Sequence, residues 1–336
     1  MKGFFPLSSN VIPIDAFIRD ALYNVDYGYY MTRVPFGKMG DFVTSSDISQ
    51  LFGETIALWL LNYLESVSLP EKFILVELGP GNGTLMNDIL RVMDGFPMHD
   101  KLLEVHLVEI SPLLRALQEK KLHDAMRSRK IFWHTNVEEL PEYPMVLIAN
   151  EFFDALPVKQ FVFINGTWRE NYVRCVEDGK LEIISLDTSR DFSQHSAPEG
   201  GIVEICDAAV ETMKNISAML RKHGGAGVII DYGYLQPVYR STIQAVKSHQ
   251  YCDFLSNVGE CDISVCVDFN ALYKAAGDVA KEVITQREFL YRFGIRERLA
   301  MLLKNATEQQ TTDLKKSYLR LTENMGTLFK VLLLHG

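Results

Sequence analysis

The sequence predicts an α/β protein built on a parallel, Rossmann-like sheet with helices on both faces. Apolar segments of strand length alternate with segments of helical spacing from Phe73 to Ala149. A glycine-rich loop joins the first of these strands to the helix that follows it. Alternation of this kind is typical of βαβ units, in which a helix connects two parallel strands. Each element can be placed in order.

Strands that end in a polar residue or a turn are expected at 73–77, 104–108, 131–134, 145–149 and 227–231. Between and around them, apolar residues recur at helical spacing, which predicts helices at 14–23, 51–64, 85–93, 113–126 and 204–222. The last of these helices ends at Gly224-Gly225. The final third is expected to hold helices at 269–276, 287–304 and 314–328, and a closing strand at 330–334.

The segment 160–186 interrupts this alternation. Asn165-Gly166 and Asp178-Gly179 each separate two β-rich runs, and such pairs are strong hairpin signals. We therefore expect an antiparallel insertion here. The predicted organisation is an N-terminal helical or lid segment over 1–68, followed by a domain over 69–336 with insertions at about 160–200 and 235–325.

The glycine loop reads FILVELGPGNGT and is the most informative segment for function. A dinucleotide fingerprint needs glycine at its first, third and sixth positions, but here Thr84 takes the sixth place after Gly79 and Gly81. A phosphate loop would need a lysine, and none is near. An acidic residue before Gly79, Gly81 and Gly83 fits S-adenosylmethionine better, because Glu77 can meet its α-ammonium group. Another nucleotide, or a purely structural turn, remains the alternative.

Glu109 ends the second predicted strand, and Ser111 and Pro112 then open a helix. An acidic residue in this place accepts hydrogen bonds from the two hydroxyls of a ribose. Because nicotinamide enzymes use the same acid, Glu109 predicts a nucleoside ligand without choosing which one.

Composition sets further bounds. The chain has 336 residues, a net charge of −9 and a pI near 5.5, which argues against a nucleic-acid substrate. Its five cysteines are scattered, and the histidines show no metal-ligand spacing, so we expect reduced thiols and no metal. No apolar run approaches the roughly 18 residues of a membrane span. We expect a soluble protein, cytoplasmic in a bacterium or, in a eukaryote, in the mitochondrial matrix after loss of a transit peptide.

Several long motifs resemble the MidA family of S-adenosylmethionine-dependent methyltransferases, among them GKMGDFVTSSDISQLFGE, VELGPGNGTLMNDILR, ANEFFDALPVKQF and IIDYGY. The resemblance runs from about Tyr27 to the C-terminus. It implies a class I methyltransferase fold with a seven-stranded sheet whose last strand is antiparallel. For the mitochondrial relative it implies symmetric dimethylation of an arginine on a NADH dehydrogenase (complex I) subunit. This chain has Gly81-Asn82-Gly83-Thr84 where the family often has GRGT.

Beside that resemblance, the segment NEFFD offers a place for an arginine side chain. A guanidinium is protonated at physiological pH and needs carboxylates to hold it and to accept its proton. Glu151 and Asp154 are the expected guanidinium-binding acids, and Asn150 is expected to orient them. In the alternative reading, Asp154 only caps a turn and the two phenylalanines belong to the core.

Two weaker cofactor contacts complete the expected site. Asp41, flanked by glycine in a long loop, could cover the cofactor as part of a lid, or could be a solvated turn residue. Asn136 follows the third strand, where a contact to adenine would lie, or simply ends that strand. The Asp231-Tyr232-Gly233-Tyr234 segment follows another strand and could complete the substrate pocket.

The leading function is therefore a protein arginine methyltransferase that uses S-adenosylmethionine. The alternatives are a methyltransferase-like assembly chaperone with little turnover and a methyltransferase acting on a small molecule. A nicotinamide oxidoreductase is disfavoured by the failed dinucleotide fingerprint. The expected partner is a protein that carries the arginine, and the aliphatic stripes of the last hundred residues predict either core or the surface of a homodimer.

Overall fold

The computed structural model describes residues 10–35, 44–67, 72–177, 179–192 and 196–336. Within this part of the chain the fold is α/β, with a central mixed sheet and two smaller antiparallel sheets. No helix of the described residues is both long and apolar enough to span a bilayer.

Eight strands form the central sheet. Seven of them follow one continuous order: β15 (Ala280–Thr285), β16 (Phe329–His335), β10 (Gly225–Tyr234), β5 (Met145–Asn150), β2 (Phe73–Leu78), β3 (Leu102–Val108) and β4 (Ile131–His134). The strands from β10 to β4 are parallel, and β16 is antiparallel to both of its neighbours, as expected for the closing strand. The eighth strand, β14 (Val267–Asp268), pairs with the end of β10. The family resemblance implied seven strands; the additional strand β14 has only two residues, which carry no alternation pattern.

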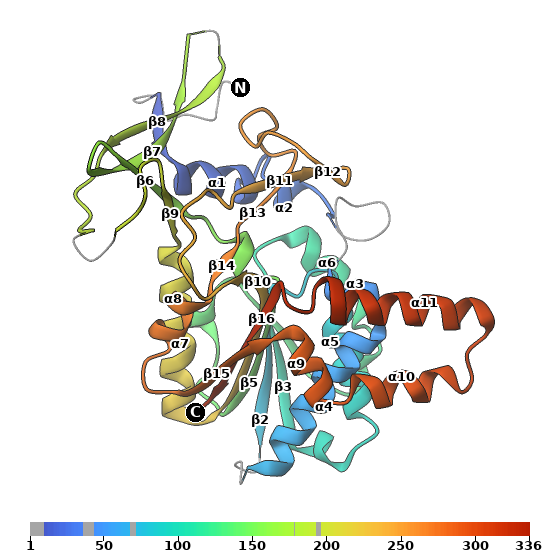
Figure 1. Ribbon diagram of the computed structural model, residues 1–336. Helices are drawn as coiled ribbons and strands as arrows, with labels where there is room; N and C mark the ends of the chain where they lie inside the picture. The colour runs from blue at the N-terminus through green and yellow to red at the C-terminus, as the bar shows by residue number, and fades with distance from the viewer. Residues whose placement is uncertain (1–9, 36–43, 68–71, 178, 193–195) are drawn as a thin grey trace.

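Alternate residues of the central strands enter two different cores, because successive side chains point to opposite faces of a sheet. Leu75 and Val146 pack with the helices of one face, whereas Ile74, Val76 and Leu147 pack with those of the other. Figure 1 shows the two helical layers on either side of the sheet. The first face carries α4 (Gln50–Ser66), α5 (Thr84–Met93), α6 (Pro112–Lys121), α9 (Gln286–Arg292) and α10 (Ile295–Leu303), and the second carries α7 (Asp207–His223) and α8 (Phe269–Ala275).

Four helix boundaries differ from the sequence-based expectation. The helix expected at 287–304 is divided into α9 and α10 by Gly294, whose left-handed backbone (φ 86°) ends the first helix. The helix expected from 204 starts later, because 202–205 pairs with another strand as β9 (Ile202–Ile205). The helix expected at 113–126 already ends at Lys121. The last one begins early, as α11 (Glu308–Leu319), and continues as a π-helical turn over Arg320–Asn324.

The expected antiparallel insertion is present and larger than predicted. Strands β6 (Lys159–Ile164), β7 (Thr167–Cys175) and β8 (Leu181–Asp187) form a meander, to which β9 and the N-terminal β1 (Val11–Pro13) are added. A second insertion forms a three-stranded sheet from β11 (Gln244–Lys247), β12 (Gln250–Tyr251) and β13 (Asp262–Ser264). Together with α1 (Ile14–Tyr23) and α2 (Tyr29–Thr32), this small sheet lies across one end of the central sheet (Figure 1).

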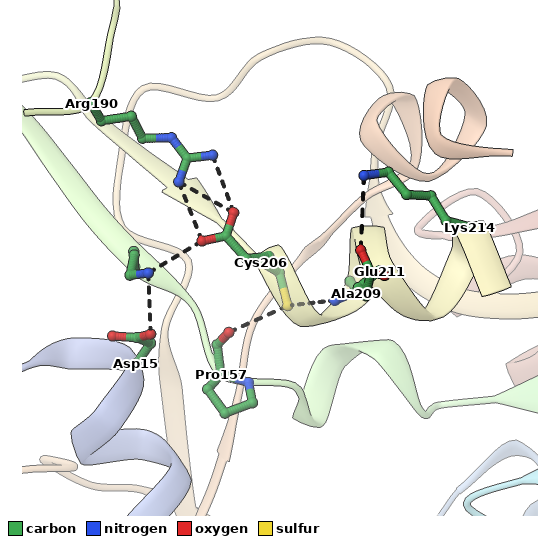
Figure 2. Close-up of polar contacts among 9 residues, drawn as sticks. Asp15, Pro157, Arg190, Cys206, Ala209, Glu211 and Lys214 are labelled. Carbon is green, nitrogen blue, oxygen red and sulfur yellow. Dashed lines mark hydrogen bonds and ion pairs between the residues drawn. The ribbon is translucent and has the colours of Figure 1, made fainter. Parts of the chain in front are cut away.

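Ion pairs join the insertion to both neighbouring parts of the chain. Lys159, the first residue of β6, pairs with Asp15 of α1 at 3.6 Å and with Asp207 of α7 at 3.2 Å. Arg190 reaches the same carboxylate of Asp207 at 3.1 Å, and Figure 2 shows Arg190 and Asp15 on opposite sides of this junction. One cluster of charges therefore ties α1, the meander and α7 together.

Cys206 caps α7 at the same junction. Its Sγ accepts a hydrogen bond from the Ala209 amide at 3.4 Å and donates one to the Pro157 carbonyl at 3.3 Å (Figure 2). Burial raises the pKa of the Cys206 thiol to about 11, so it stays protonated and can donate. The thiol thus has a structural role in fixing the start of α7.

The same substitution should have different effects at two adjacent glycines, Gly224 at the end of α7 and Gly225 at the start of β10. A Cβ at Gly225 would lie 1.9 Å from the Met145 carbonyl oxygen, whereas at Gly224 it would meet nothing within 4 Å. Both residues have positive φ. Gly225→Ala should therefore lower the free energy of unfolding by more than about 3 kcal/mol, and Gly224→Ala by less, about 1–3 kcal/mol for its backbone conformation alone. Urea unfolding followed by circular dichroism measures both, and equal losses would contradict the close approach of β10 to β5.

Candidate functional site

A cavity of about 1080 Å³ opens at the carboxyl ends of the central strands. It is lined by most of the residues that the sequence predicts for the site: Glu77, Gly79, Gly81, Glu109, Asn136, Asn150, Glu151 and Asp154. Gly83 lies behind the loop, where it starts α5 and does not line the cavity. Asp41 lies outside the described residues.

The glycine loop turns sharply between β2 and α5. Gly79, Gly81 and Gly83 all have positive φ, of 60°, 56° and 80°. At Gly79 a Cβ would also lie 2.9 Å from the ring of Phe152, so a side chain there would displace the segment that follows β5. The loop and that segment are therefore packed directly against one another.

Glu77 presents an unsatisfied carboxylate oxygen beside this loop. Its side chain is 2% exposed, and Oε2 has no hydrogen-bond partner among the described residues. Burial raises the pKa of Glu77 to about 8, although a backbone hydrogen bond from Met86 lowers it. A buried acceptor without a partner is costly, and a cationic ligand would relieve that cost.

Glu109 is held by groups that fix both of its oxygens. Oε1 accepts a hydrogen bond from the Ser111 amide at 2.8 Å, and Oε2 accepts one from Gln118 Nε2 at 3.1 Å. The same Gln118 nitrogen donates to the Gly81 carbonyl at 2.8 Å, and Trp133 Nε1 donates to Gln118 Oε1 at 2.8 Å. Burial raises the pKa of Glu109 to about 7.

Sequence reasoning missed Gln118, which links the glycine loop to the acid at the end of β3. A signal was present, because Leu114, Gln118 and Leu122 share one buried face of α6 at spacings of four residues. A glutamine in such an apolar stripe needs buried partners.

Asn136 lies at the rim of the cavity, in an exposed position. Its Nδ2 donates a hydrogen bond to Glu139 Oε1 at 2.8 Å, within the turn that follows β4. The location agrees with the expected contact to adenine, and the contact itself remains a prediction.

The segment after β5 carries the predicted acids on a strained turn. Glu151 has φ 50°, which is uncommon for a residue with a side chain, and its amide donates to the Ile230 carbonyl at 2.9 Å. Its Oε1 accepts hydrogen bonds from the Ser45 amide at 2.7 Å and from Asn150 Nδ2 at 3.3 Å. Asn150 keeps a buried Oδ1 without a partner among the described residues. Strained residues of this kind cluster at functional sites.

Asp231 holds this turn from the neighbouring strand. It is fully buried, and its Oδ2 accepts hydrogen bonds from the amides of Phe153 at 3.0 Å and Asp154 at 3.1 Å. Its Oδ1 accepts one from the amide of Tyr232 at 2.9 Å. Sequence analysis suggested that Asp231 completes the substrate pocket. That suggestion is wrong for Asp231, whose oxygens face the backbone of the turn, whereas Tyr232 does line the cavity.

Asp154 lies among other acidic and phenolic groups. Burial raises its pKa well above the usual range, the charges of Asp262 and Glu151 raise it further, and a hydrogen bond with Tyr232 lowers it. Burial likewise raises the pKa of Glu151. Phe153 is 1% exposed and belongs to the core, as the alternative reading of NEFFD expected. Among the described residues, no lysine or arginine forms an ion pair with Glu151 or Asp154.

One short helix connects the two halves of the cavity. In α3 (Ser45–Ile48), the Ser45 amide contacts Glu151, and Asp47 Oδ1 accepts a hydrogen bond from Asn82 Nδ2 at 2.9 Å. Asn82 in turn accepts one from the Thr84 amide at 3.0 Å. Asn82 thus fastens the glycine loop to the segment that contacts Glu151.

These residues fit S-adenosylmethionine. The orphaned oxygen of Glu77 suits an α-ammonium group, the fixed carboxylate of Glu109 suits ribose hydroxyls, and the loop at Gly79 and Gly81 allows close approach of a ligand. No group of His, Cys, Asp or Glu in the described ranges is arranged to hold a metal ion.

Comparison with known proteins agrees with this fit. Residues 55–286 match the family model Methyltransf_28, which describes S-adenosyl-L-methionine-dependent methyltransferases. A Drosophila melanogaster protein named protein arginine methyltransferase NDUFAF7 homolog, mitochondrial, is 33% identical over 97% of this chain and 82% of its own length. The Homo sapiens protein named protein arginine methyltransferase NDUFAF7, mitochondrial, is 32% identical over 90% of this chain and 74% of its own length.

Solved structures of similar proteins also indicate a methyltransferase fold. A COG1565 superfamily member from Burkholderia thailandensis, bound to S-adenosyl-homocysteine, has a TM-score of 0.86 and 26% identity, and the match covers 97% of this chain and 88% of that one. A native structure of a COG1565 protein from the same species has a TM-score of 0.83 and 27% identity, covering 97% and 87%. The fold is thus that of the class I methyltransferases, and S-adenosylmethionine is the cofactor. The chain belongs to this family of S-adenosylmethionine-dependent methyltransferases, in agreement with its resemblance to the MidA family.

Proposed function

We propose that this methyltransferase transfers methyl groups to an arginine side chain of a protein. The observation that carries the proposal is the pair of partly buried carboxylates, Glu151 and Asp154, in the same cavity as the cofactor loop. Partly buried acids without a cationic partner favour a positively charged ligand. The arginine methyltransferase names of the relatives support the same acceptor.

The chemistry asked of these residues is binding and proton transfer. When bound, S-adenosylmethionine would supply a sulfonium-bound methyl group, which a nitrogen lone pair could accept in line with S-adenosylhomocysteine as the leaving group. Glu151 and Asp154 hold the guanidinium through charge-assisted hydrogen bonds and leave one terminal nitrogen directed at the cofactor half of the cavity. Because burial raises the pKa of both carboxyl groups, either is a stronger proton acceptor than an exposed acid. Asn150 orients Glu151 through its Nδ2 contact.

Finer aspects of the proposal rest on the family resemblance. We propose symmetric dimethylation as the product and a NADH dehydrogenase (complex I) subunit as the acceptor. The relatives named mitochondrial support the mitochondrial matrix for a eukaryotic chain, and cytoplasm is proposed for a bacterial one. For the domain organisation we keep 1–68 as an N-terminal segment and 69–336 as the catalytic domain, and a homodimer stays a prediction.

Two alternatives make different predictions. An assembly chaperone with little turnover would bind a partner protein but transfer no label, since a fold does not fix a function. A methyltransferase acting on a small molecule would label no protein. The unpartnered oxygen of Glu77 and the fixed carboxylate of Glu109 favour turnover, because a scaffold has no need of a formed cofactor site.

Incubation of the protein and radiolabelled S-adenosylmethionine with an extract of cells lacking its gene tests the proposal. We expect one labelled protein band, with the methyl groups on an arginine by mass spectrometry. Glu151→Gln and Asp154→Asn should each reduce the labelling rate about 100-fold or more, the range typical for loss of an acid–base group. Both variants should bind S-adenosylhomocysteine like the original protein.

Gly81→Val serves as the negative control, because it blocks the cofactor loop and should abolish labelling. Label on a residue other than arginine would refute the arginine assignment. If no protein is labelled, the chaperone and small-molecule alternatives gain, and Glu151 and Asp154 lose their roles.

Cofactor binding should depend on pH. The pKa of Glu77 is about 8 in the free protein, and pairing with an ammonium group favours its ionised form, so binding below pH 8 should release a proton. The affinity for S-adenosylhomocysteine should therefore rise between pH 6 and pH 8, by at most about tenfold per pH unit for this group. Titration calorimetry in two buffers of different ionisation enthalpy measures the proton release.

Glu77→Gln should bind more weakly and retain only the shallower pH dependence contributed by Glu109, whose pKa is about 7. Glu119→Gln, on the exposed side of α6, is the matched control and should behave like the unaltered protein. An affinity that does not change between pH 6 and pH 8 would remove Glu77 from the ammonium site.

A further inference from the structure

The acceptor half of the cavity contains a further carboxylate from a different part of the chain. Asp262 begins β13, in the small sheet of the second insertion, and lines the same cavity as Glu151 and Asp154 while being 8% exposed. The Tyr30 hydroxyl donates a hydrogen bond of 2.6 Å to its Oδ1. The insertion and the N-terminal helix α2 therefore meet at this side chain, which lines the same cavity as the turn that follows β5.

Asp262 interacts with Asp154 of that turn, and the amide of Val265, on the same segment as Asp262, donates to the Asp154 carbonyl at 3.0 Å. After burial, the charge of Asp262 is the largest cause of the raised pKa of Asp154. Burial raises the pKa of Tyr30, and the charge of Asp262 is the next largest cause. The pKa of Tyr23 is raised by burial, then by the charge of Asp154, and then by that of Asp262. Asp262 thus shares one electrostatic environment with Asp154 and these phenols, and a cation bound there would interact with both carboxylates.

Three tyrosines, Tyr23, Tyr30 and Tyr232, line the cavity together with the carboxylates. Tyr23 and Tyr30 stack with ring centroids 5.8 Å apart and planes 21° apart. The Tyr23 hydroxyl donates to the Ala155 carbonyl at 2.9 Å, directly beside Asp154. The Tyr232 hydroxyl also forms hydrogen bonds with Asp154 and Ser264. Rings anchored by their hydroxyls can offer their faces to a planar cation.

We propose that Asp262, positioned by Tyr30, binds the acceptor side chain from the edge opposite Glu151 and Asp154 and selects a guanidinium over an ammonium. This inference rests on the proposed function. A guanidinium carries five N–H donors around a planar fork, so carboxylates on two separate elements can each bind one of its edges. An ammonium group presents three donors from a single atom and gains less from a second carboxylate on another element.

Binding of two peptides to the protein saturated with S-adenosylhomocysteine tests the inference. The probes are acetyl-Gly-Arg-Gly-amide and acetyl-Gly-Lys-Gly-amide, and calorimetry gives both dissociation constants. We expect the unaltered protein to prefer the arginine peptide. Asp262→Asn should weaken that peptide about tenfold to 100-fold, the range for a hydrogen bond to a charged group, and should change the lysine peptide much less.

Three further measurements separate binding from folding. S-Adenosylhomocysteine affinity should be unchanged in Asp262→Asn. Tyr30→Phe, which removes only the hydroxyl that positions Asp262, should give a smaller loss for the arginine peptide. In Asp262→Asn, arginine-peptide binding should also persist to lower pH, because the pKa of Asp154 falls when the neighbouring charge is removed. Asp253→Asn, an exposed change in the same insertion, is the matched control.

The possible results are distinguishable. If Asp262→Asn and Tyr30→Phe both bind the arginine peptide as the unaltered protein does, the role of Asp262 is refuted while the proposed function stands. If the unaltered protein shows no preference for the arginine peptide, the guanidinium site fails as a whole, and this inference fails with it.

Discussion

The buried carboxylate of Asp231 fixes the turn on which the proposed chemistry depends. From β10 it accepts hydrogen bonds from the amides of Phe153 and Asp154, in the turn that follows the neighbouring strand β5. It accepts a third from the amide of Tyr232. Glu151 adopts a left-handed backbone in the same turn, at a cost on the order of 1–3 kcal/mol. Burial raises the pKa of Asp231 well above its usual range, so we count these as ordinary hydrogen bonds of about 0.5–1.5 kcal/mol each, and three of them together can offset this cost. Without Asp231, the turn would lack the partners that keep Glu151 and Asp154 directed at the cavity.

Direct contacts link the two halves of the cavity, the cofactor loop and the turn that follows β5. Phe152 packs against the glycine loop at Gly79, and α3 contacts Glu151 at one end and Asn82 at the other. Displacement of the cofactor loop would therefore move the acids of the turn as well. This coupling explains why a glycine substitution in the loop is expected to affect the acceptor half of the site. Precise placement matters because methyl transfer depends mainly on the alignment of the reacting groups.

The sequence predicted the parallel core, and most of its candidate site residues line one cavity, because both depend on local patterns. Buried β-branched runs, the glycine loop and the acids at strand ends identified β2, β3 and β5 together with Glu77, Glu109, Glu151 and Asp154. It could not predict contacts between distant segments. Gln118, Asp231 and Asp262 act through partners 37, 78 and 232 residues away, which no spacing rule reveals. The strands β1, β9 and β14 were missed for the same reason, since each is short and exists only through its pairing.

The central claim is that one cavity brings a methyl donor to a guanidinium held by acids. A crystal structure with S-adenosylhomocysteine and a short arginine peptide tests it most directly. The account predicts that the guanidinium lies between the Glu151–Asp154 turn and Asp262, with one terminal nitrogen facing the cofactor sulfur. A peptide bound outside the cavity, or a guanidinium directed into solvent while the cofactor site is filled, would contradict it.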